Sequence, residues 1–295
     1  MPLLLRPRAN IFKGMNTLLC LGHGYSALAL APSLLVRSWR VIGTTRQPGA
    51  MAAIAVTGVE PVLWGDAVAD AIAAASHILV SAAPDAGGDP SLREFGAALA
   101  RARPNWVGYL STTAVYGDHG GAWVDEQTPL TPSSARGAAR VAAEAAWVAT
   151  GLPVHVFRLA GIYGPGRGPF EKVRDGTARR ILKPGQVFSR IHVSDIAGAL
   201  LASIDRPMPG AVYNICDDDP AAPEDVLSYA AQLLGLPEPP GVPFDQAQMT
   251  EMARSFSAEN QRVRNDRMKR DLGYVLQYPD YRAGLRGLLA AGREG

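Results

Sequence analysis

The sequence predicts an α/β fold, a doubly wound parallel sheet with a smaller C-terminal lobe that binds substrate. Two observations support this prediction. From residue 17 to about residue 165, short apolar runs of strand length alternate with longer helical patterns. This order is typical of a parallel sheet with right-handed crossover helices. Past Gly164 the alternation gives way to dense proline and glycine, which indicates a second lobe.

The first strand–helix unit carries a glycine-rich loop. An apolar run over 18–21 meets GHGYSA, and a helical pattern follows over 26–37. In this dinucleotide-binding, Rossmann-type fingerprint Gly22 permits a tight turn, Gly24 lets a pyrophosphate approach the backbone, and Ala27 lets the helix pack on the strand. The free N–H groups at the helix start favour phosphate. We predict a cofactor loop made of Gly22, His23, Gly24, Tyr25, Ser26 and Ala27. The alternatives are a glycine turn without a ligand, and for His23 a ring that only fills the turn.

The second strand, expected over 40–44, ends in the sequence GTTR. This lies about twenty residues after the glycine loop, where the adenosine ribose is recognised. No carboxylate stands there to bind the 2′-hydroxyl of NAD; Thr44, Thr45 and Arg46 take its place. Arg46 can hold a 2′-phosphate through charge-assisted hydrogen bonds, so we predict NADP ahead of NAD. The alternative is a solvated arginine at a strand end.

The next elements follow in the same alternation. A third strand is expected over 61–64, followed by Gly65, Asp66 and an alanine-rich helix that ends at Ala75. A fourth strand over 78–81 leads into small residues that let a cofactor lie against the backbone, although a plain turn would use the same residues. Asp66 is also predicted to contact the cofactor, together with Ser81, Ala82, Ala83 and Pro84. Later elements are a helix over 91–102, a strand over 106–110, a helix over 135–150 and a strand over 154–159.

The C-terminal part returns once to the strand–helix pattern. After a basic helix over 170–180, the segment 190–204 reads as strand and helix with Ser194 or Asp195 as cap, and 212–215 as a last strand. We expect residues 17–165, completed by 190–216, to form the core. Residues 166–189 and 217–295 should form the smaller substrate lobe, with a pocket at the carboxyl edge of the sheet. Residues 1–16 are expected to be a disordered extension, with Met15 as an alternative start.

Composition excludes several classes of partner. The formal net charge of +2 gives no case for nucleic acid or an acidic membrane, and no apolar run reaches membrane-spanning length. Cys20 and Cys216 resemble buried thiols of a reduced compartment rather than a disulfide. The histidines and cysteines show no metal-ligand spacing, so no metal is expected. We expect a cytoplasmic protein.

Several motifs, in this order, resemble the extended short-chain dehydrogenase/reductase superfamily of NAD-dependent sugar epimerases and dehydratases, most closely its atypical branch. The segments that carry the resemblance are GHGYSA, STTAVYG, DEQTPLTP, ARVAAE, FRLAGIYGPGR, RIHVSDIAGALLA and VYNICDD, spread over residues 17 to about 285. The resemblance implies an NAD(P)-dependent enzyme with a small-molecule substrate and, because helices flanking the sheet often pair in this family, a homodimer. It also places Ala160, Gly161 and Ile162 beside the nicotinamide.

In that family a Ser or Thr, a Tyr and a Lys carry the chemistry. The resemblance assigns the hydroxyl to Thr112, the tyrosine position to Arg136 and the lysine position to Arg140, so RGAAR stands where the family has Tyr-x-x-x-Lys. An arginine stays protonated and cannot shuttle a proton as tyrosine does. Arg140 can still orient the nicotinamide ribose. The alternative is an ion-paired helix stripe of Arg136, Arg140 and Glu144 at i, i+4 spacing.

The proton carrier stays open at this point. Tyr116, the closing tyrosine of STTAVYG, is our candidate beside Thr112 and Arg140, with Tyr163 as a second and packing as the alternative for both. We expect four polar residues to line the lobe side of the pocket: Arg167, Arg190, Asn260 and Arg262. The arginines among them would suit an anionic substrate. The alternative is that they are surface charges. His192 is expected in the core and Asp217–Asp219 in a solvated turn. The predicted function is an NAD(P)-dependent oxidoreductase or epimerase-like enzyme; the alternative is a non-catalytic NADP(H)-binding sensor.

Overall fold

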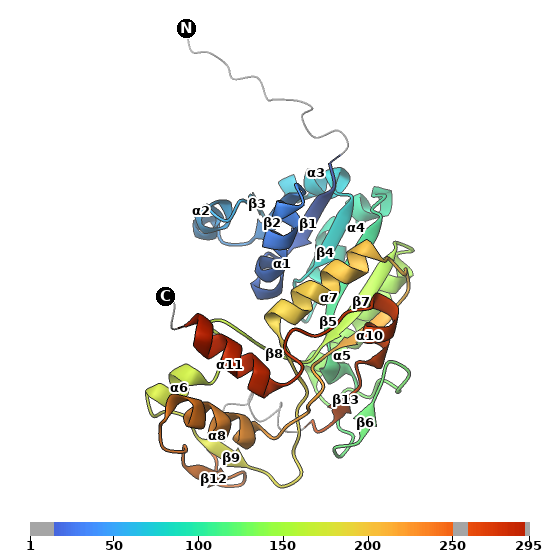
Figure 1. Ribbon diagram of the computed structural model, residues 1–295. Coiled ribbons are helices and arrows are strands. Elements are labelled where there is room, and N and C mark those ends of the chain that lie inside the picture. Colours follow the sequence, from blue (N-terminus) through green and yellow to red (C-terminus); the bar gives the residue numbers. More distant parts are fainter. Residues whose placement is uncertain (1–14, 250–258, 293–295) are drawn as a thin grey trace.

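A seven-stranded parallel sheet, counted over the described residues, forms the centre of the molecule in the strand order β11-β7-β5-β4-β1-β2-β3 (Figure 1). The computed structural model describes residues 15–249 and 259–292. Residues 1–14 of the expected N-terminal extension therefore lie outside the described residues. The strands of the sheet are β1 (Thr17–Leu21), β2 (Arg40–Thr45), β3 (Glu60–Leu63), β4 (His77–Val80), β5 (Trp106–Thr112), β7 (Val154–Leu159) and β11 (Val212–Ile215). Every pairing between them is parallel, which confirms the predicted sheet.

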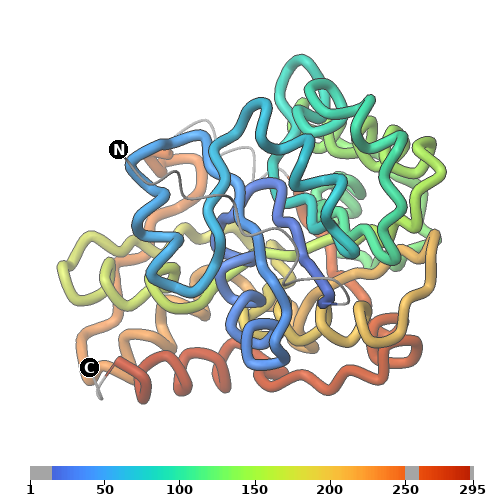
Figure 2. Tube along the Cα trace, turned by 90° about the horizontal axis from the view of Figure 1, so that it is seen from above, coloured from blue at the N-terminus to red at the C-terminus, as the bar shows by residue number. Residues whose placement is uncertain are grey.

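Helices cover both faces of this sheet. They are α1 (Tyr25–Val36), α3 (Ala67–Ala74), α4 (Pro90–Arg101), α5 (Ala135–Ala149) and α7 (Val193–Asp205), with the short α2 (Met51–Ala55) beside β3. Figure 2 separates α1 and α7 on one side from α4 and α5 on the other. Along β1, Leu18 and Cys20 join the first hydrophobic cluster while Leu19 and Leu21 join the second. Burial on both faces explains why this strand is continuously apolar.

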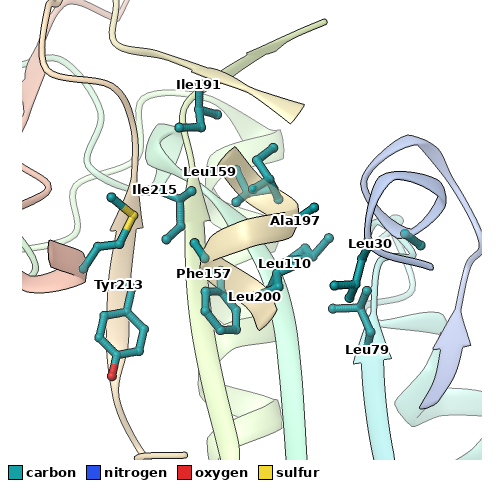
Figure 3. Close-up of a cluster of buried hydrophobic side chains, with 14 of the residues drawn as sticks. Leu30, Leu79, Leu110, Phe157, Leu159, Ile191, Ala197, Leu200, Tyr213 and Ile215 are labelled. Carbon is teal, nitrogen blue, oxygen red and sulfur yellow. The ribbon is translucent and has the colours of Figure 1, made fainter. Parts of the chain in front are cut away.

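The helix α7 packs the segment 190–215 against the sheet and against α1. Ala197 and Leu200 of α7 pack over Phe157 and Leu159 of β7, and Leu30 of α1 belongs to the same cluster (Figure 3). Burying one such large side chain fully is worth about 1.5–3 kcal/mol. This packing holds α7 beside α1, so that residues 190–215 return to the sheet and add β11 at its edge.

A smaller group of elements lies together beyond one end of the sheet (Figure 1). It consists of α6 (Phe170–Arg174), β9 (Arg180–Leu182), α8 (Pro223–Leu234), β12 (Gly241–Pro243) and α11 (Tyr281–Ala291). Phe170, Ala230, Tyr281 and Leu285 form a hydrophobic cluster of their own. Short strand pairs connect this group to the sheet: β8 (Gly161–Tyr163) with β10 (Arg190–His192), and β6 (Trp123–Val124) with β13 (Arg262–Val263), which precedes α10 (Asp266–Leu272).

Two local expectations are wrong. The basic helix ends at Arg174 rather than Arg180, because Gly176 adopts a left-handed backbone (φ 72°) that turns the chain toward β9. The cap of α7 is His192, whose Nδ1 accepts the N–H of Ser194 at 3.2 Å. Asp195 is instead buried, where it accepts hydrogen bonds from the tyrosine hydroxyl and the backbone of residues 274–278.

Candidate active site

A cavity of about 830 Å³ opens at the carboxyl end of the sheet. Residues from the glycine loop, the ends of β4, β5 and β7, the helix α5 and the strands β8 and β10 line it. The predicted site residues that it brings together are Gly24, Tyr25, Ser26, Ser81, Ala83, Thr112, Arg140, Ala160, Gly161 and Ile162. The predicted residues that do not line it are Gly22, His23, Ala27, Thr44, Thr45, Arg46, Asp66, Ala82, Pro84 and Tyr116. β1 and β4 are neighbours at the point where the strand order reverses, which is where ligands bind in open α/β sheets.

The glycine loop has the shape that a pyrophosphate needs. Gly22 has a φ of 89°, and a Cβ there would lie 2.9 Å from the backbone nitrogen of Ala82, so only glycine lets the two loops approach. At Gly24 a Cβ would meet only the Ser81 hydroxyl, at 4.0 Å, so space above this backbone is open to the cavity. Gly24 caps α1 without a side chain, and no acid stands in the first turn. The helix N–H groups therefore remain available to an anion.

Two members of the predicted cofactor site have structural roles instead. The Thr44 hydroxyl accepts the N–H of Gly22 at 2.7 Å and donates to the carbonyl oxygen of Cys20 at 3.1 Å, so it ties the loop to the sheet and is not free to bind ribose. The His23 ring packs against Gly43, where an added Cβ would lie 2.6 Å from its Cγ. Burial lowers the pKa of His23. His23 thus fills the turn in its neutral form and does not line the cavity.

The end of β2 presents Arg46 on the outside of the cavity. Its guanidinium lies over the Trp64 ring, 4.9 Å from the ring centroid. The Thr45 hydroxyl is engaged in a local turn, where it accepts the N–H of Gln47 at 3.1 Å and donates to the carbonyl oxygen of Gln47 at 3.5 Å. Asp66 is exposed at the start of α3 and its side chain makes no cap hydrogen bond. Of this group, Arg46 is the residue whose charged side chain is exposed at the end of β2.

Thr112 and Arg140 meet at the carboxyl end of β5. Thr112 is the last residue of β5 and its hydroxyl accepts the N–H of Ala114 at 3.3 Å. Arg140 reaches from α5 and donates from Nη1 to the carbonyl oxygen of Leu110 at 2.5 Å and to the Tyr109 hydroxyl at 3.2 Å. These bonds hold its positive charge beside Thr112 in the cavity wall.

Glu144, the third member of the possible ion-paired stripe on α5, is bound elsewhere. It is buried and pairs with Arg158 of β7 at 2.8 Å, and it accepts the Ser111 hydroxyl at 2.5 Å. Arg158 in turn donates to the Tyr116 hydroxyl at 3.0 Å. The recurrence of charges along α5 therefore reflects two separate environments: Arg140 faces the cavity, and Glu144 lies in a buried network between α5 and β7.

Tyr116 belongs to this buried network and not to the cavity. It is fully buried, and its hydroxyl donates to Oδ1 of Asn214 at 2.7 Å while accepting from Arg158. Burial raises the pKa of Tyr116 to about 12. The expectation that Tyr116 carries a proton is thus corrected: both hydrogen-bonding roles of its hydroxyl are taken by the protein, and Tyr116 does not line the cavity.

Comparison with known proteins gives the family. A family model described as the NAD dependent epimerase/dehydratase family matches residues 19–216. The chain belongs to this family. Protein YeeZ of Escherichia coli K12 is 31% identical over 288 residues, which cover 90% of this chain and 97% of that protein.

Solved structures resemble the epimerase/dehydratase chain along nearly its whole length. A functionally unknown conserved protein from Silicibacter pomeroyi DSS is 58% identical, with a TM-score of 0.89 and coverage of 94% of this chain and 99% of that one. dTDP-glucose 4,6-dehydratase from Bacillus anthracis str. Ames, solved in complex with NAD, is 19% identical with a TM-score of 0.76. This match covers 96% of this chain and 97% of the dehydratase chain. The second likeness shows the fold alone.

The other candidate proton donor of this epimerase/dehydratase family member is also enclosed. Tyr163 lines the cavity, but its hydroxyl is buried and packs against Gly284 of α11, where any Cβ would overlap it. Burial raises the pKa of Tyr163 far above its ordinary value, and the nearby Asp217 raises it further. A tyrosine in this setting holds its proton at neutral pH.

The lobe side of the cavity differs in part from the sequence prediction. Arg167 and Arg190 line it as expected. Asn260 and Arg262 do not, because the Asn260 amide donates to the carbonyl oxygen of Gly185 at 3.0 Å and Arg262 donates to that of Gly121. Their neighbours in sequence, Glu259 and Gln261, line the cavity instead. Side chains alternate in an extended segment, so neighbouring positions face opposite ways.

Of the remaining polar predictions, the one for His192 agrees with the structure and the one for Asp217 does not. His192 is buried, as expected of a core histidine. Asp217 is not part of a solvated turn, because it is only 1% exposed. Burial raises the pKa of Asp217 to about 8, although the positive charge of Arg190 lowers it. Cys20 and Cys216 are free, buried thiols. Within residues 15–249 and 259–292 there is no cluster of three or more metal-binding side chains and no helix long and apolar enough to cross a membrane.

Proposed function

We propose that this protein is an NAD(P)-dependent oxidoreductase or epimerase-type enzyme that exchanges a hydride between a nicotinamide and a small substrate beside Thr112. One observation carries the proposal. A single cavity joins Gly24 and Ser81, on the side of the glycine loop, to Thr112 and Arg140 at the end of β5. A cofactor that follows this cavity would place its pyrophosphate at the start of α1 and its nicotinamide near β5 and β7.

The residues would divide the work as follows. Gly22, Gly24 and the first N–H groups of α1 would hold the pyrophosphate. Arg140 would orient the nicotinamide ribose, and Thr112 would donate a hydrogen bond to the reacting oxygen of the substrate. The cofactor supplies the hydride chemistry, while the protein supplies position and electrostatics.

We propose NADP as the preferred cofactor, on the strength of Arg46. The Trp64 ring beneath its guanidinium supports this charge at the carboxyl end of β2. A hydrogen bond from Arg46 to a 2′-phosphate would contribute about 1.5–3 kcal/mol. Neither Thr44 nor Thr45 adds a donor, so the preference rests on Arg46.

The substrate is proposed to be an anionic small molecule. Four arginines line the cavity against one acid, and Arg167 and Arg190 stand on the lobe side of it. Their charges would attract a carboxylate or phosphate of the substrate. We further propose that the protein is cytoplasmic, because its free thiols fit a reducing compartment. We also propose that it forms a homodimer.

The second candidate is a non-catalytic NADP(H) sensor, which Arg136 favours because an arginine cannot take the proton-shuttling role of a tyrosine. Both candidates bind the cofactor, so turnover separates them. Oxidation of NADPH is followed with a panel of aldehydes, 2-oxo acids and nucleotide sugars. We expect turnover with an anionic member of the panel, whereas a sensor binds NADPH and oxidises it with none.

The Thr112→Val variant tests the assignment within that panel. It removes the hydroxyl at nearly constant shape and should lower turnover about 10²-fold, as for loss of a positioned catalytic group, with little change in NADPH affinity. The control is Thr57→Val, since the Thr57 hydroxyl donates to the carbonyl oxygen of Ile54 at 2.7 Å and Thr57 does not line the cavity. Equal turnover in the Thr112 variant and the control would refute the role of Thr112.

A further inference from the structure

The cavity contains one acidic side chain, Glu259, which the proposed mechanism has not used. Glu259 is 6% exposed and stands three residues before β13. It lies in the same cavity as Thr112, Arg136 and Arg140. A carboxyl group that lines the same cavity as Thr112 is a candidate for proton transfer, the step for which this chain lacks its family's tyrosine.

Hydrogen bonds hold the segment 259–263 against the reaction centre. The backbone oxygen of Glu259 accepts the Gln186 amide at 2.7 Å. Two residues on, the Gln261 amide donates to the carbonyl oxygen of Thr113, the neighbour of Thr112, at 3.3 Å. Because the segment is extended, Glu259 and Gln261 point to the same side, into the cavity, while Asn260 points away. The position of the carboxyl group is therefore determined by the fold.

The surroundings of the carboxyl group tie it to the start of α5. Its Oε1 accepts the hydroxyls of Ser133 and Ser134, each at 3.2 Å, and Ser134 is the cap of α5. Arg136 follows two residues later and acts electrostatically on Glu259. Arg136 thus replaces the family's tyrosine with a positive charge that faces an acid.

Burial keeps the Glu259 carboxyl group protonated to a higher pH than that of an exposed glutamate. Burial raises the pKa of Glu259; the two serine hydroxyls and Arg136 oppose this, and Asp118 adds to it. The net direction is upward, so more of the acid form persists toward neutral pH than for an exposed glutamate. Arg140 also acts electrostatically on Arg136.

We propose that Glu259 is the acid–base catalyst of this enzyme and that Arg136 stabilises its carboxylate; this inference rests on the proposed function. In the reducing direction, the carbonyl carbon of the substrate accepts a hydride from the reduced cofactor. The carbonyl oxygen takes the proton of the Glu259 carboxyl group, and the product is an alcohol. The carboxylate left behind stands beside Arg136 and recovers a proton from water. In the oxidising direction the same carboxylate accepts the hydroxyl proton.

Hydride transfer measured over a range of pH tests this role. The wild type is given NADPH and the carbonyl compound that it reduces fastest among aldehydes, 2-oxo acids and nucleotide 4-keto sugars. Its rate should fall as pH rises through the pKa of Glu259, because only the acid form donates. Glu259→Gln should lower the rate about 10²-fold and remove this limb of the profile. Glu259→Asp should keep the limb with part of the rate.

The matched control is Glu126→Gln. Glu126 also has a pKa raised by burial, but it accepts the N–H of Asn214 at 2.8 Å and does not line the cavity, so its variant should keep the wild-type rate and profile. Wild-type NADPH affinity shows that each variant is folded. A Glu259→Gln variant with the wild-type rate and pH profile would overturn the role of Glu259 alone. A wild type that binds NADPH and reduces no compound would overturn the proposed function, and the role of Glu259 with it.

Discussion

The two glycines of the cofactor loop should respond differently to substitution. At Gly22, alanine must adopt a φ of 89° and place its Cβ 2.9 Å from the Ala82 nitrogen. The strained backbone costs about 1–3 kcal/mol, and the forced overlap about 1–3 kcal/mol more. Gly22→Ala should therefore lower the free energy of unfolding by about 2–6 kcal/mol, a large part of the stability of a typical domain.

Gly24 has none of these constraints. Its φ is −95°, and the space beside it is open to 4.0 Å, so Gly24→Val should cost the fold no more than about 1 kcal/mol, as a poorer helix cap. The valine would occupy the place of the pyrophosphate and should weaken NADPH binding by about 10²-fold, or about 2.7 kcal/mol.

Urea unfolding and calorimetric titration with NADPH measure the two effects separately. Gly22→Ala should lose stability, and Gly24→Val should lose affinity while it stays folded. A stable Gly22→Ala protein would show that the loops after β1 and β4 do not approach as closely as the structure has them. A folded Gly24→Val protein with wild-type affinity would show that the cofactor does not cross this loop.

Three further outcomes are expected. Arg46→Ala should weaken NADP by about 1.5–3 kcal/mol and leave NAD nearly unchanged; equal losses in titrations with both cofactors would mean that Arg46 does not read the 2′ position. Arg158→Met should lower the free energy of unfolding by about 3–5 kcal/mol, because Glu144 would stay buried without its partner, and urea unfolding of the double variant with Glu144→Gln should show recovery of part of that loss. Burial lowers the pKa of His77 from 6.5 to about 4, so its neutral form stabilises the fold above pH 6.5 and that contribution is lost as the pH falls toward 4. His192 has the same shift, so His77→Gln should reduce the slope of the unfolding free energy over this interval without abolishing it, and an unchanged slope would contradict the burial argument.

The sequence alone predicted the parallel sheet and the glycine loop between β1 and α1. Both depend on local information. Strands buried on two faces must be continuously apolar, as 18–21 is, and a turn with positive φ followed by close backbone approach requires glycine at 22. The helix start that follows presents free N–H groups, which favour an anion. The alternation of strands and helices predicts a parallel sheet, whereas the strand order that places the cavity is given by the folded structure.

Only the tertiary structure decided which side chains enter the cavity. Tyr116 and Thr44 bear hydroxyls at suitable places in sequence, but partners from β7, β11 and the glycine loop occupy them. Glu259 gives no signal in sequence, and its neighbours Asn260 and Arg262 were expected in its place. A shift of one residue in an extended segment exchanges the faces of all its side chains, and that choice is made by long-range hydrogen bonds such as Gln261 to Thr113. Local pattern therefore predicts the scaffold, whereas the chemistry of the site depends on contacts between segments far apart in the chain.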